Sequence, residues 1–167
     1  MNIVLYEPEI PGNTGNIIRT CVATNTRLHL IEPLGFRLNS KEAKRAGMDY
    51  FEHLDYKRYY NFEDFLKQNN YPKIYMGTTK AKKIYTQVDY EKDAYIMFGK
   101  ESAGIPEEIL VEYENTCVRI PMFDEYRSLN LSNSVSIVLY EALRQNDFEN
   151  FKLKGNLHHL EWKSDKD

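Results

Sequence analysis

The sequence predicts an α/β protein with a mostly parallel sheet covered by helices on both faces. Short apolar segments rich in β-branched and aromatic residues alternate with segments of helical periodicity along most of the chain. Such alternation is typical of strand–helix–strand units, whose strands pair in parallel. The chain has 167 residues, 42% of them hydrophobic, which suffices for one packed core. We therefore expect a single domain over residues 1–150 and a polar tail over residues 151–167.

The expected strands are the short apolar runs that end at glycine, proline or polar residues. Each is four or five residues long, as strands of compact domains usually are. They are Asn2–Tyr6, Arg27–Ile31, Lys73–Met76, Ala94–Phe98 and Thr116–Ile120.

The expected helices occupy the segments between these strands and after the last one. Apolar residues at helical spacing predict helices over 16–24 and 61–68, and over a long stretch that ends near Asn146. Ser132 or Asn133 is the expected N-cap of that last helix, and Pro106 lies in the first turn of another helix. A short basic helix is expected over 40–46.

The charge of the chain does not by itself indicate a nucleic-acid partner. The net charge is −3, whereas general polyanion-binding modules are usually basic. Basic residues nevertheless form two groups in the sequence. They suit local contact with a structured RNA, and solvated surface side chains explain them almost as well. The groups are Arg37, Lys41, Lys44 and Arg45, and Lys80, Lys82 and Lys83.

The chain carries no sign of a metal site, a disulfide framework or a membrane segment. Cys21 and Cys117 stand far apart, and neither has a cysteine or histidine neighbour in the sequence. We interpret both as buried, reduced thiols and His158-His159 as a solvated pair. No apolar run approaches the roughly 20 residues that span a bilayer. The first residues also lack the basic start of a signal peptide, so we expect a cytoplasmic protein. Because no ligand cluster is present in the sequence, we expect no metal.

The first of three unusual segments runs from Pro8 to Arg19, after the first strand. We expect a loop containing Gly12 and Gly15 that opens a helix, whose free N–H groups favour an anion such as a phosphate. Arg19, one turn inside that helix, would suit a phosphate or a ribose. A tight turn followed by a surface arginine is an equally good interpretation. The segment lacks the G-x-G-x-x-G pattern of dinucleotide-binding proteins.

The second segment runs from Tyr95 to Pro106. Its strand ends at Gly99, where the absence of a side chain would let the main chain approach a ligand closely. Glu101 would then lie at the mouth of a site, and Gly104 would form a second turn. A turn glycine and a solvated glutamate are the alternative.

The third segment, from Arg119 to Ser134, is long and dense in small polar side chains. Such side chains can bind the main chain or a ligand, and there are more of them than one helix cap needs. Leu129 and Leu131, placed between them, could hold a flat base while main-chain groups bind its edge. Here the functional interpretation is favoured. The polar residues are Ser128, Asn130, Ser132 and Asn133.

Together, the three segments resemble the three motifs of the SPOUT class of RNA methyltransferases. They are most similar to the small TrmL-like members, which methylate the ribose 2′-oxygen of the tRNA wobble nucleotide. The likeness covers residues 1 to about 146, with Gly77 and Ala81 departing from the usual pattern. The matching stretches are 13–19, 98–106, 119–122 and 128–133, with support from 2–8 and 30–36.

The resemblance implies more than the periodicity does. It implies a trefoil knot formed by the C-terminal segment and a homodimer that acts on the anticodon loop of tRNA. S-adenosylmethionine is the implied cofactor. The residues expected to bind it are Gly77, Thr78, Thr79, Gly99, Glu101, Ile120, Met122, Ser128, Leu129 and Leu131.

The resemblance also implies five catalytic residues, namely Asn13, Arg19, Glu101, Ser128 and Asn130. An arginine is a poor base, since guanidinium groups stay protonated in proteins. We therefore expect Arg19 to stabilise a developing alkoxide electrostatically and to be supplied by the other subunit. The alternative functions are 2′-O-methylation at another RNA site and a non-catalytic RNA-binding module.

Overall fold

A parallel sheet of seven strands forms the centre of the computed structural model, which describes residues 1–38, 48–123 and 128–162. The strand order is β3-β2-β1-β6-β4-β7-β5, and every neighbouring pair is parallel. The predicted α/β class with a parallel sheet is therefore confirmed. The strands are β1 (Asn2–Tyr6), β2 (Arg27–Ile31), β3 (Tyr56–Tyr59), β4 (Ile74–Gly77), β5 (Lys83–Ile84), β6 (Tyr95–Phe98) and β7 (Cys117–Arg119).

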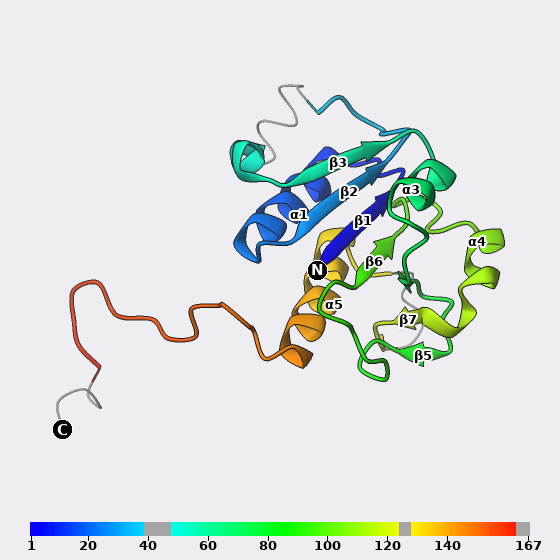
Figure 1. Cartoon of the computed structure of the whole chain (residues 1–167). Helices are drawn as coiled ribbons and strands as arrows, with labels where there is room; N and C mark the ends of the chain where they lie inside the picture. The colour runs from blue at the N-terminus through cyan, green and yellow to red at the C-terminus, as the bar shows by residue number, and fades with distance from the viewer. Residues whose placement is uncertain (39–47, 124–127, 163–167) are drawn as a thin grey trace.

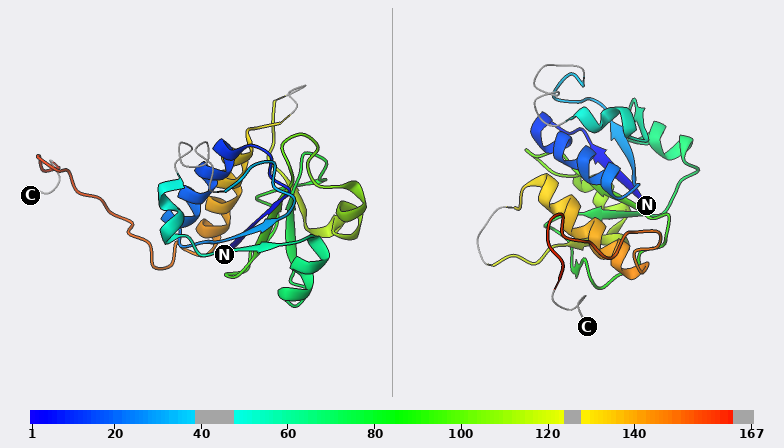
Figure 2. Two further views of the ribbon diagram at one scale, coloured as in Figure 1. Left: turned by 90° about the horizontal axis from the view of Figure 1, so that it is seen from above. Right: turned by 90° about the vertical axis from the view of Figure 1, so that its left-hand side faces the viewer.

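Helices cover both faces of this sheet, as Figures 1 and 2 show. Helices α1 and α5 lie side by side on one face, and α3 and α4 lie on the other. Two 3-10 helices, η1 and η2, complete the described elements. The helices are α1 (Pro11–Ala23), η1 (Met48–His53), α3 (Phe62–Gln68), α4 (Glu107–Glu112), η2 (Glu114–Thr116) and α5 (Leu131–Gln145).

The two-residue period of the strands explains this three-layer arrangement. Ile3 and Leu5 of β1 pack toward α1 and α5, whereas Val4 between them packs toward α3 and α4. Met97 of β6 likewise faces away from Ile96. Both faces of the central strands are thus buried, as parallel sheets require.

Helix α1 begins earlier than the sequence predicts. The predicted start at Asn16 is wrong, since the helix begins at Pro11, whose fixed φ suits the first helical position. Gly12 lies inside α1 rather than in a preceding loop. The turn that reverses the chain comes before the helix, at Glu7, which has a φ of 50°.

Two short strands and η1 were not predicted, and one predicted helix cannot be compared. Strand β3 lies at the edge of the sheet and buries only Tyr59, while β5 has just two residues. Neither carries the apolar run that predicts a strand. The basic helix expected over 40–46, with Lys41, Lys44 and Arg45, lies in 39–47, outside the described residues.

The N-cap of α5 also differs from the prediction. Asn130 caps the helix, because its side-chain oxygen accepts from the N–H groups of Ser132 and Asn133. Ser132 and Asn133, the predicted caps, lie within the first turn. The cap connects the third unusual segment directly to the core helix.

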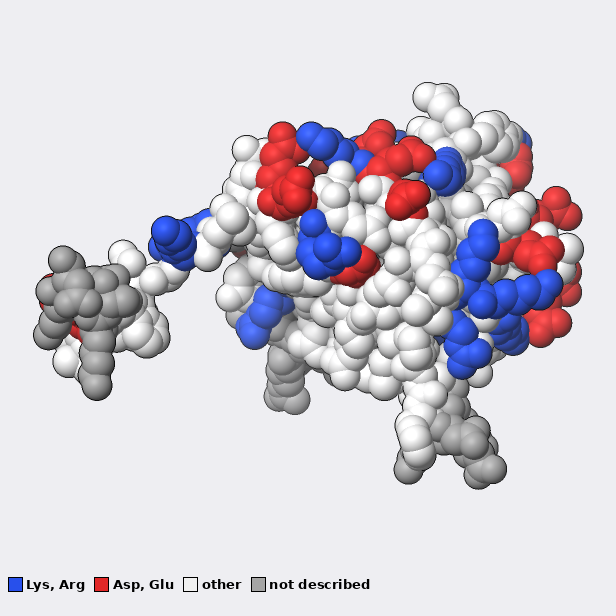
Figure 3. All heavy atoms as spheres, turned by 90° about the horizontal axis from the view of Figure 1, so that it is seen from below, with Lys and Arg blue, Asp and Glu red and all other residues white. Residues whose placement is uncertain are grey.

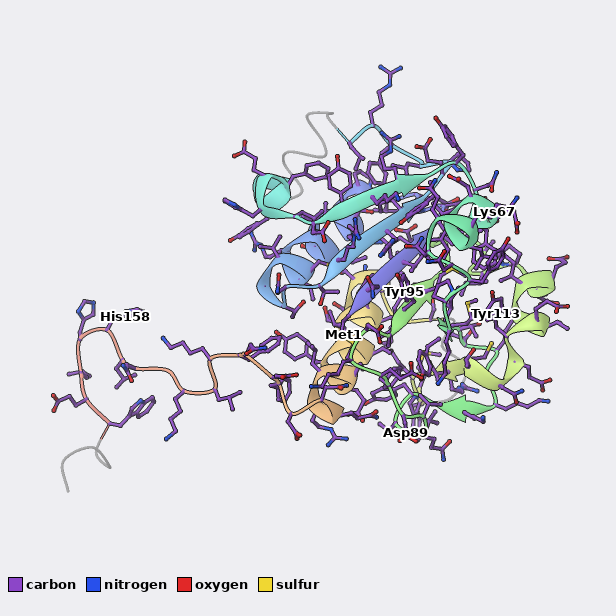
Figure 4. The ribbon with its side chains drawn as sticks, viewed as in Figure 1. Met1, Lys67, Asp89, Tyr95, Tyr113 and His158 are labelled. Carbon is purple, nitrogen blue, oxygen red and sulfur yellow. The ribbon has the colours of Figure 1, made fainter. Side chains whose placement is uncertain are left out.

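The end of the chain lies apart from the core elements (Figure 1), and the two thiols are buried as predicted. Residues 151–162 carry no helix or strand, and His158 lies in the segment that extends away from the sheet (Figure 4). Cys21 and Cys117 are buried and free, and burial raises the pKa of the Cys21 thiol to about 12. None of the described helices is long and apolar enough to cross a membrane.

Candidate active site at the carboxyl ends of the central strands

A cavity of about 670 Å³ opens where the neighbouring strands β6, β4 and β7 end. Parallel strands present their carboxyl ends at one edge of the sheet, so the segments that follow them meet there. The volume is typical of small-molecule sites. The lining from these segments comprises Gly77–Lys80, Phe98–Ile105, Ile120 and Met122, and 128–131 closes the cavity together with Ile10 and Asn13.

The floor of the cavity depends on two glycines. A Cβ at Gly77 would lie 2.5 Å from the ring of Phe98, its partner on β6, so that ring takes the space of a side chain. A Cβ at Gly99 would lie 2.0 Å from the carbonyl carbon of Gly104. Gly99 was predicted to admit a ligand, but its open space is taken by the protein's own main chain. Gly104 has a φ of 72°, which favours glycine.

Glu101 does not project into the cavity as a free acid. Its Oε2 accepts from the N–H of Glu9 at 2.8 Å, and its Oε1 accepts from the N–H of Ile10 at 3.3 Å. Oε1 also accepts from Nδ2 of Asn13 at 2.9 Å. The N–H groups near the start of α1, which were predicted to bind an external phosphate, therefore bind this carboxylate.

Asn13 and Asn130 continue the hydrogen-bond chain that begins at Glu101. Nδ2 of Asn130 donates to Oδ1 of Asn13 at 2.8 Å, and Oδ1 of Asn130 accepts from Ser132 N–H at 2.9 Å. Asn13 is buried, so its amide has few other partners. One side-chain network thus joins all three segments that were singled out in the sequence.

An ion pair between Lys100 and Glu7 lies next to Glu101 in the chain. Lys100 Nζ lies 2.8 Å from Oε2 of Glu7, and both side chains are largely covered. The hydrogen bond from Lys100 to Glu7 raises the pKa of the lysine. Lys100 is therefore engaged within the chain rather than directed into the cavity as a free cation.

Arg19 lies apart from the cavity of its own chain. Its side chain is exposed on α1, and its guanidinium carbon lies 5.0 Å from the centroid of the Tyr50 ring. Asn13 and Arg19 are six residues apart, which places them roughly 120° apart around a helix. The two side chains therefore lie on different faces of α1, and Arg19 is not among the residues that line the cavity.

Of the predicted site residues, the structure thus brings together all except Arg19. Asn13, Glu101, Ser128 and Asn130 line the cavity, as do the ten residues expected to bind the cofactor. Several lining residues were not named as site residues, although they lie in the segments that were singled out; they include Ile10, Phe98 and Ser134. Val118 lies in the strand expected before the third segment, and helical periodicity could have indicated Val138.

Two of the three lysines in the second basic group are paired with acids. Nζ of Lys80 lies 2.8 Å from Glu107, and Nζ of Lys82 lies 2.6 Å from Glu114. Lys83 donates to the carbonyl of Asn115 at 3.1 Å. Figure 3 shows basic and acidic side chains next to each other on the side of α4. This group therefore presents little unbalanced positive charge.

The donor set of the cavity suits an adenosine-containing ligand better than a metal ion. Polar residues of 99–101 and 128–131, together with Thr78 and Thr79, line the cavity beside apolar residues such as Ile120, Met122 and Leu131. Binding sites for flat, partly polar ligands combine such surfaces. Among the residues that the structure describes, no three histidine, cysteine, aspartate or glutamate side chains are grouped as metal ligands.

Comparison with known proteins agrees with this geometry. The fold and the cavity define a parallel α/β protein with a ligand site at the carboxyl ends of its strands. The model of the SpoU rRNA methylase family matches residues 1–140. The chain therefore belongs to this family.

Individual relatives are similar over most of the chain. The tRNA (cytidine(34)-2′-O)-methyltransferase of Escherichia coli K12 is 48% identical over 146 residues, which are 87% of this chain and 93% of that protein. A structure described as giving insights into the 2-OH methylation of C/U34 on tRNA is 39% identical, with a TM-score of 0.83 over 89% of this chain and 97% of that one. An AdoMet-bound rRNA methyltransferase from Sinorhizobium meliloti is 31% identical, with a TM-score of 0.76 over 86% of this chain and 55% of that one.

Proposed function

We propose that this chain is an S-adenosylmethionine-dependent methyltransferase that modifies the ribose 2′-oxygen of the tRNA wobble nucleotide, cytidine or uridine 34. The observation that carries the proposal is the single cavity in which Glu101, Asn13 and Asn130 connect all three motif segments. The names of the relatives that cover nearly the whole chain supply the substrate.

The residues around the cavity would bind the cofactor, which supplies a methyl group on a sulfonium, already activated for transfer. Main-chain groups of Gly99, Ile120 and Leu129 border the space in which its adenosine would lie. Leu131 and Met122 add apolar surface, which excludes water from the reacting centre. A dry site favours this transfer, because the charges of sulfonium and alkoxide disappear as they react.

The protein must also position and activate a ribose hydroxyl, which is a weak nucleophile. Ser128 and Asn130 line the cavity and would position the ribose. Because both oxygens of Glu101 accept hydrogen bonds from 9–13, we assign it an orienting role and not that of a base. The proton would leave to a phosphate or to water.

Arg19 of the second subunit would stabilise the developing alkoxide. Its position on the face of α1 away from its own cavity supports a homodimer in which α1 meets the partner's site. A guanidinium there would stabilise negative charge without accepting a proton.

The same proposal includes a knotted C-terminal region within one domain over residues 1–150. Strand β7 lies between the earlier strands β4 and β5, and the chain then returns to pack α5 against α1, which supports a threaded path. Residues 124–127 of that path lie outside the described residues. An enzyme that modifies tRNA would act in the cytoplasm, and a sulfonium donor, already activated for transfer, would need no metal.

The proposal is tested by incubating the purified chain with labelled S-adenosylmethionine and tRNA from cells that lack wobble methylation. Nucleoside mapping is expected to locate the label on the 2′-oxygen of nucleotide 34. Label at another nucleotide would favour a different RNA site instead. No transfer, together with no cofactor binding by calorimetry, would favour a non-catalytic RNA-binding module.

Arg19→Ala is expected to lower the single-turnover rate at least about 100-fold while cofactor affinity is kept. Arg27→Ala is the matched control, because Arg27 is an exposed arginine that pairs with Asp55 at the other end of the strands. A near-normal rate for Arg19→Ala would remove Arg19 from the mechanism.

A further inference from the structure

Two loops beside the cavity hold each other by reciprocal hydrogen bonds. As described above, the carboxylate of Glu101 accepts from the N–H groups of Glu9 and Ile10. In the other direction, the carboxylate of Glu9 accepts from Ser102 N–H at 2.9 Å and from Ser102 Oγ at 2.8 Å. Each carboxylate therefore binds the main chain of the other loop. We call this arrangement of Glu9, Glu101 and Ser102 the clasp.

The Glu9 side of the clasp is fixed from behind by a third loop. A Cβ at Gly35 would lie 2.7 Å from the Cα of Glu9, so the two main chains are in close contact. Gly35 N–H also donates to the carbonyl of Pro8 at 2.9 Å. Glu9 is thus a fixed point against which the loop after β6 is held.

The Ser102 side has fewer supports of its own. Ser102 and Ala103 are exposed, and the turn is closed by one main-chain bond from Gly104 N–H to the carbonyl of Lys100 at 2.8 Å. Its other restraints are the ion pair of Lys100 with Glu7 and the close main-chain packing of Gly99 against Gly104 and Ile105. Neither of these holds Ser102 itself, so loss of its bonds to Glu9 would release the residue next to Glu101.

The position of Glu101 determines the direction of the amide chain. A carboxylate only accepts hydrogen bonds, so Asn13 must turn Nδ2 toward Glu101 and Oδ1 toward Asn130. Asn130 must then turn its own oxygen toward the N–H of Ser132, and this bond caps α5. If Glu101 moves away, Asn13 loses the partner that prevents its amide from turning over.

We propose that Glu9 is a positioning residue for methyl transfer, holding Glu101 on Asn13 through its hydrogen bonds to Ser102. This inference rests on the proposed function. Glu9 makes no contact with a reacting group and acts only through Glu101 and the two asparagines.

Glu9→Gln tests the inference, because it keeps the size of the side chain but replaces one acceptor oxygen with a donor. In single turnovers at saturating cofactor and tRNA, we expect the rate to fall at least about tenfold. The cofactor dissociation constant should change much less, because the lining of the cavity is intact. Glu91→Gln is the matched control, since Glu91 pairs with Lys73 away from the clasp. A Glu9→Gln rate within about twofold of wild type would overturn the inference.

A double variant separates action through Glu101 from an independent effect. In the Glu101→Gln background, Glu9→Gln should lower the rate by no more than about twofold, since its target is already altered. If the two effects multiply in full, Glu9 does not act through Glu101, and the inference is wrong.

A spectroscopic measurement tests the clasp without any methylation. In ¹H–¹⁵N spectra, the main-chain amide of Ile10 and the side-chain amide of Asn13 should shift in Glu9→Gln but not in Glu91→Gln. Unshifted signals would contradict the inference even if the rate falls. If Glu9→Gln does not fold, Ser102→Ala removes only one bond and should shift the same signals by less. A wild-type chain without methylation would refute the proposed function, whereas the spectra would still decide whether the clasp exists.

Discussion

At the scale of single residues, the site depends on positions where no side chain fits. The ring of Phe98 occupies the space beside Gly77, and the main chain of Gly104 and Ile105 occupies the space beside Gly99. The sequence indicated that Gly99 was a special position. It could not indicate that the neighbour would be the chain itself, because that contact depends on how the turn at 100–104 folds back.

Gly99→Ala should lower the free energy of unfolding by about 1–3 kcal/mol, because its Cβ would overlap main-chain atoms that cannot easily move. It should also weaken cofactor binding, since the cavity lining must shift. Gly12→Ala is the control. A Cβ there meets nothing within 4 Å, and alanine favours the helix by up to about 0.5 kcal/mol. Urea denaturation measures the free energy of unfolding of both variants. Equal values for Gly99→Ala and Gly12→Ala would contradict the predicted overlap at Gly99.

At the scale of the elements, the sequence predicts buried strands more accurately than strands at the edge of the sheet. Strands β1 and β2 match the predicted ranges because both are buried and mostly apolar, although His29 interrupts the apolar run of β2. Edge strand β3 was missed because Lys57 and Arg58 interrupt its pattern. The start of α1 was misplaced because its glycines were interpreted as loop residues, whereas Pro11 begins the helix. Residues of all three motif segments line the cavity, and it was their polar residues after buried strands that indicated these segments in the sequence.

The N-cap of α5 couples helix stability to the site, and variants of Asn130 should separate the two. Asn130→Ala loses the cap and should destabilise the chain by about 1 kcal/mol. Asn130→Asp keeps the capping oxygen but sets a second oxygen against Oδ1 of Asn13. Both variants should lose turnover, and only the alanine variant should lose the helix cap. Full activity of Asn130→Asp would show that the bond between the two asparagines is not needed.

Strand β2 carries a buried titratable group, which should make stability depend on pH. His29 is fully buried, with Nδ1 2.7 Å from Tyr59 Oη, and burial lowers its pKa to about 3 from an ordinary 6.5. Below pH 6.5 the unfolded chain binds a proton that the folded chain does not. Stability should therefore fall as the pH falls from about 6.5 toward 3, by up to about 1.4 kcal/mol per pH unit.

Urea denaturation at pH 7 and pH 5 tests this pH dependence. His29→Gln should flatten it, because the titrating group is removed. His53→Gln should retain it, since His53 is exposed. An unchanged slope in His29→Gln would assign the effect to other groups.

At the scale of the whole molecule, one chain supplies a cavity but leaves Arg19 outside it. The sequence placed Arg19 near the other motif residues, because it follows Asn13 closely. Helix geometry separates them, since α1 presents the two side chains on different faces. Either Arg19 has no part in the reaction or a second chain brings it to the cavity.

Mixed dimers distinguish these possibilities. One subunit would carry Arg19→Ala and the other Leu129→Arg, which places a charged side chain in the cavity. Dimers purified through two different tags then contain one intact cavity that faces an intact Arg19, provided that Arg19 acts across the interface. Such dimers should recover about half of the wild-type single-turnover amplitude, although each parent homodimer is nearly inactive. A mixed dimer no more active than its parents would mean that Arg19 does not serve the partner's cavity. Because each single chain then lacks either the cavity or the arginine, recovery can come only from an active site built by two subunits.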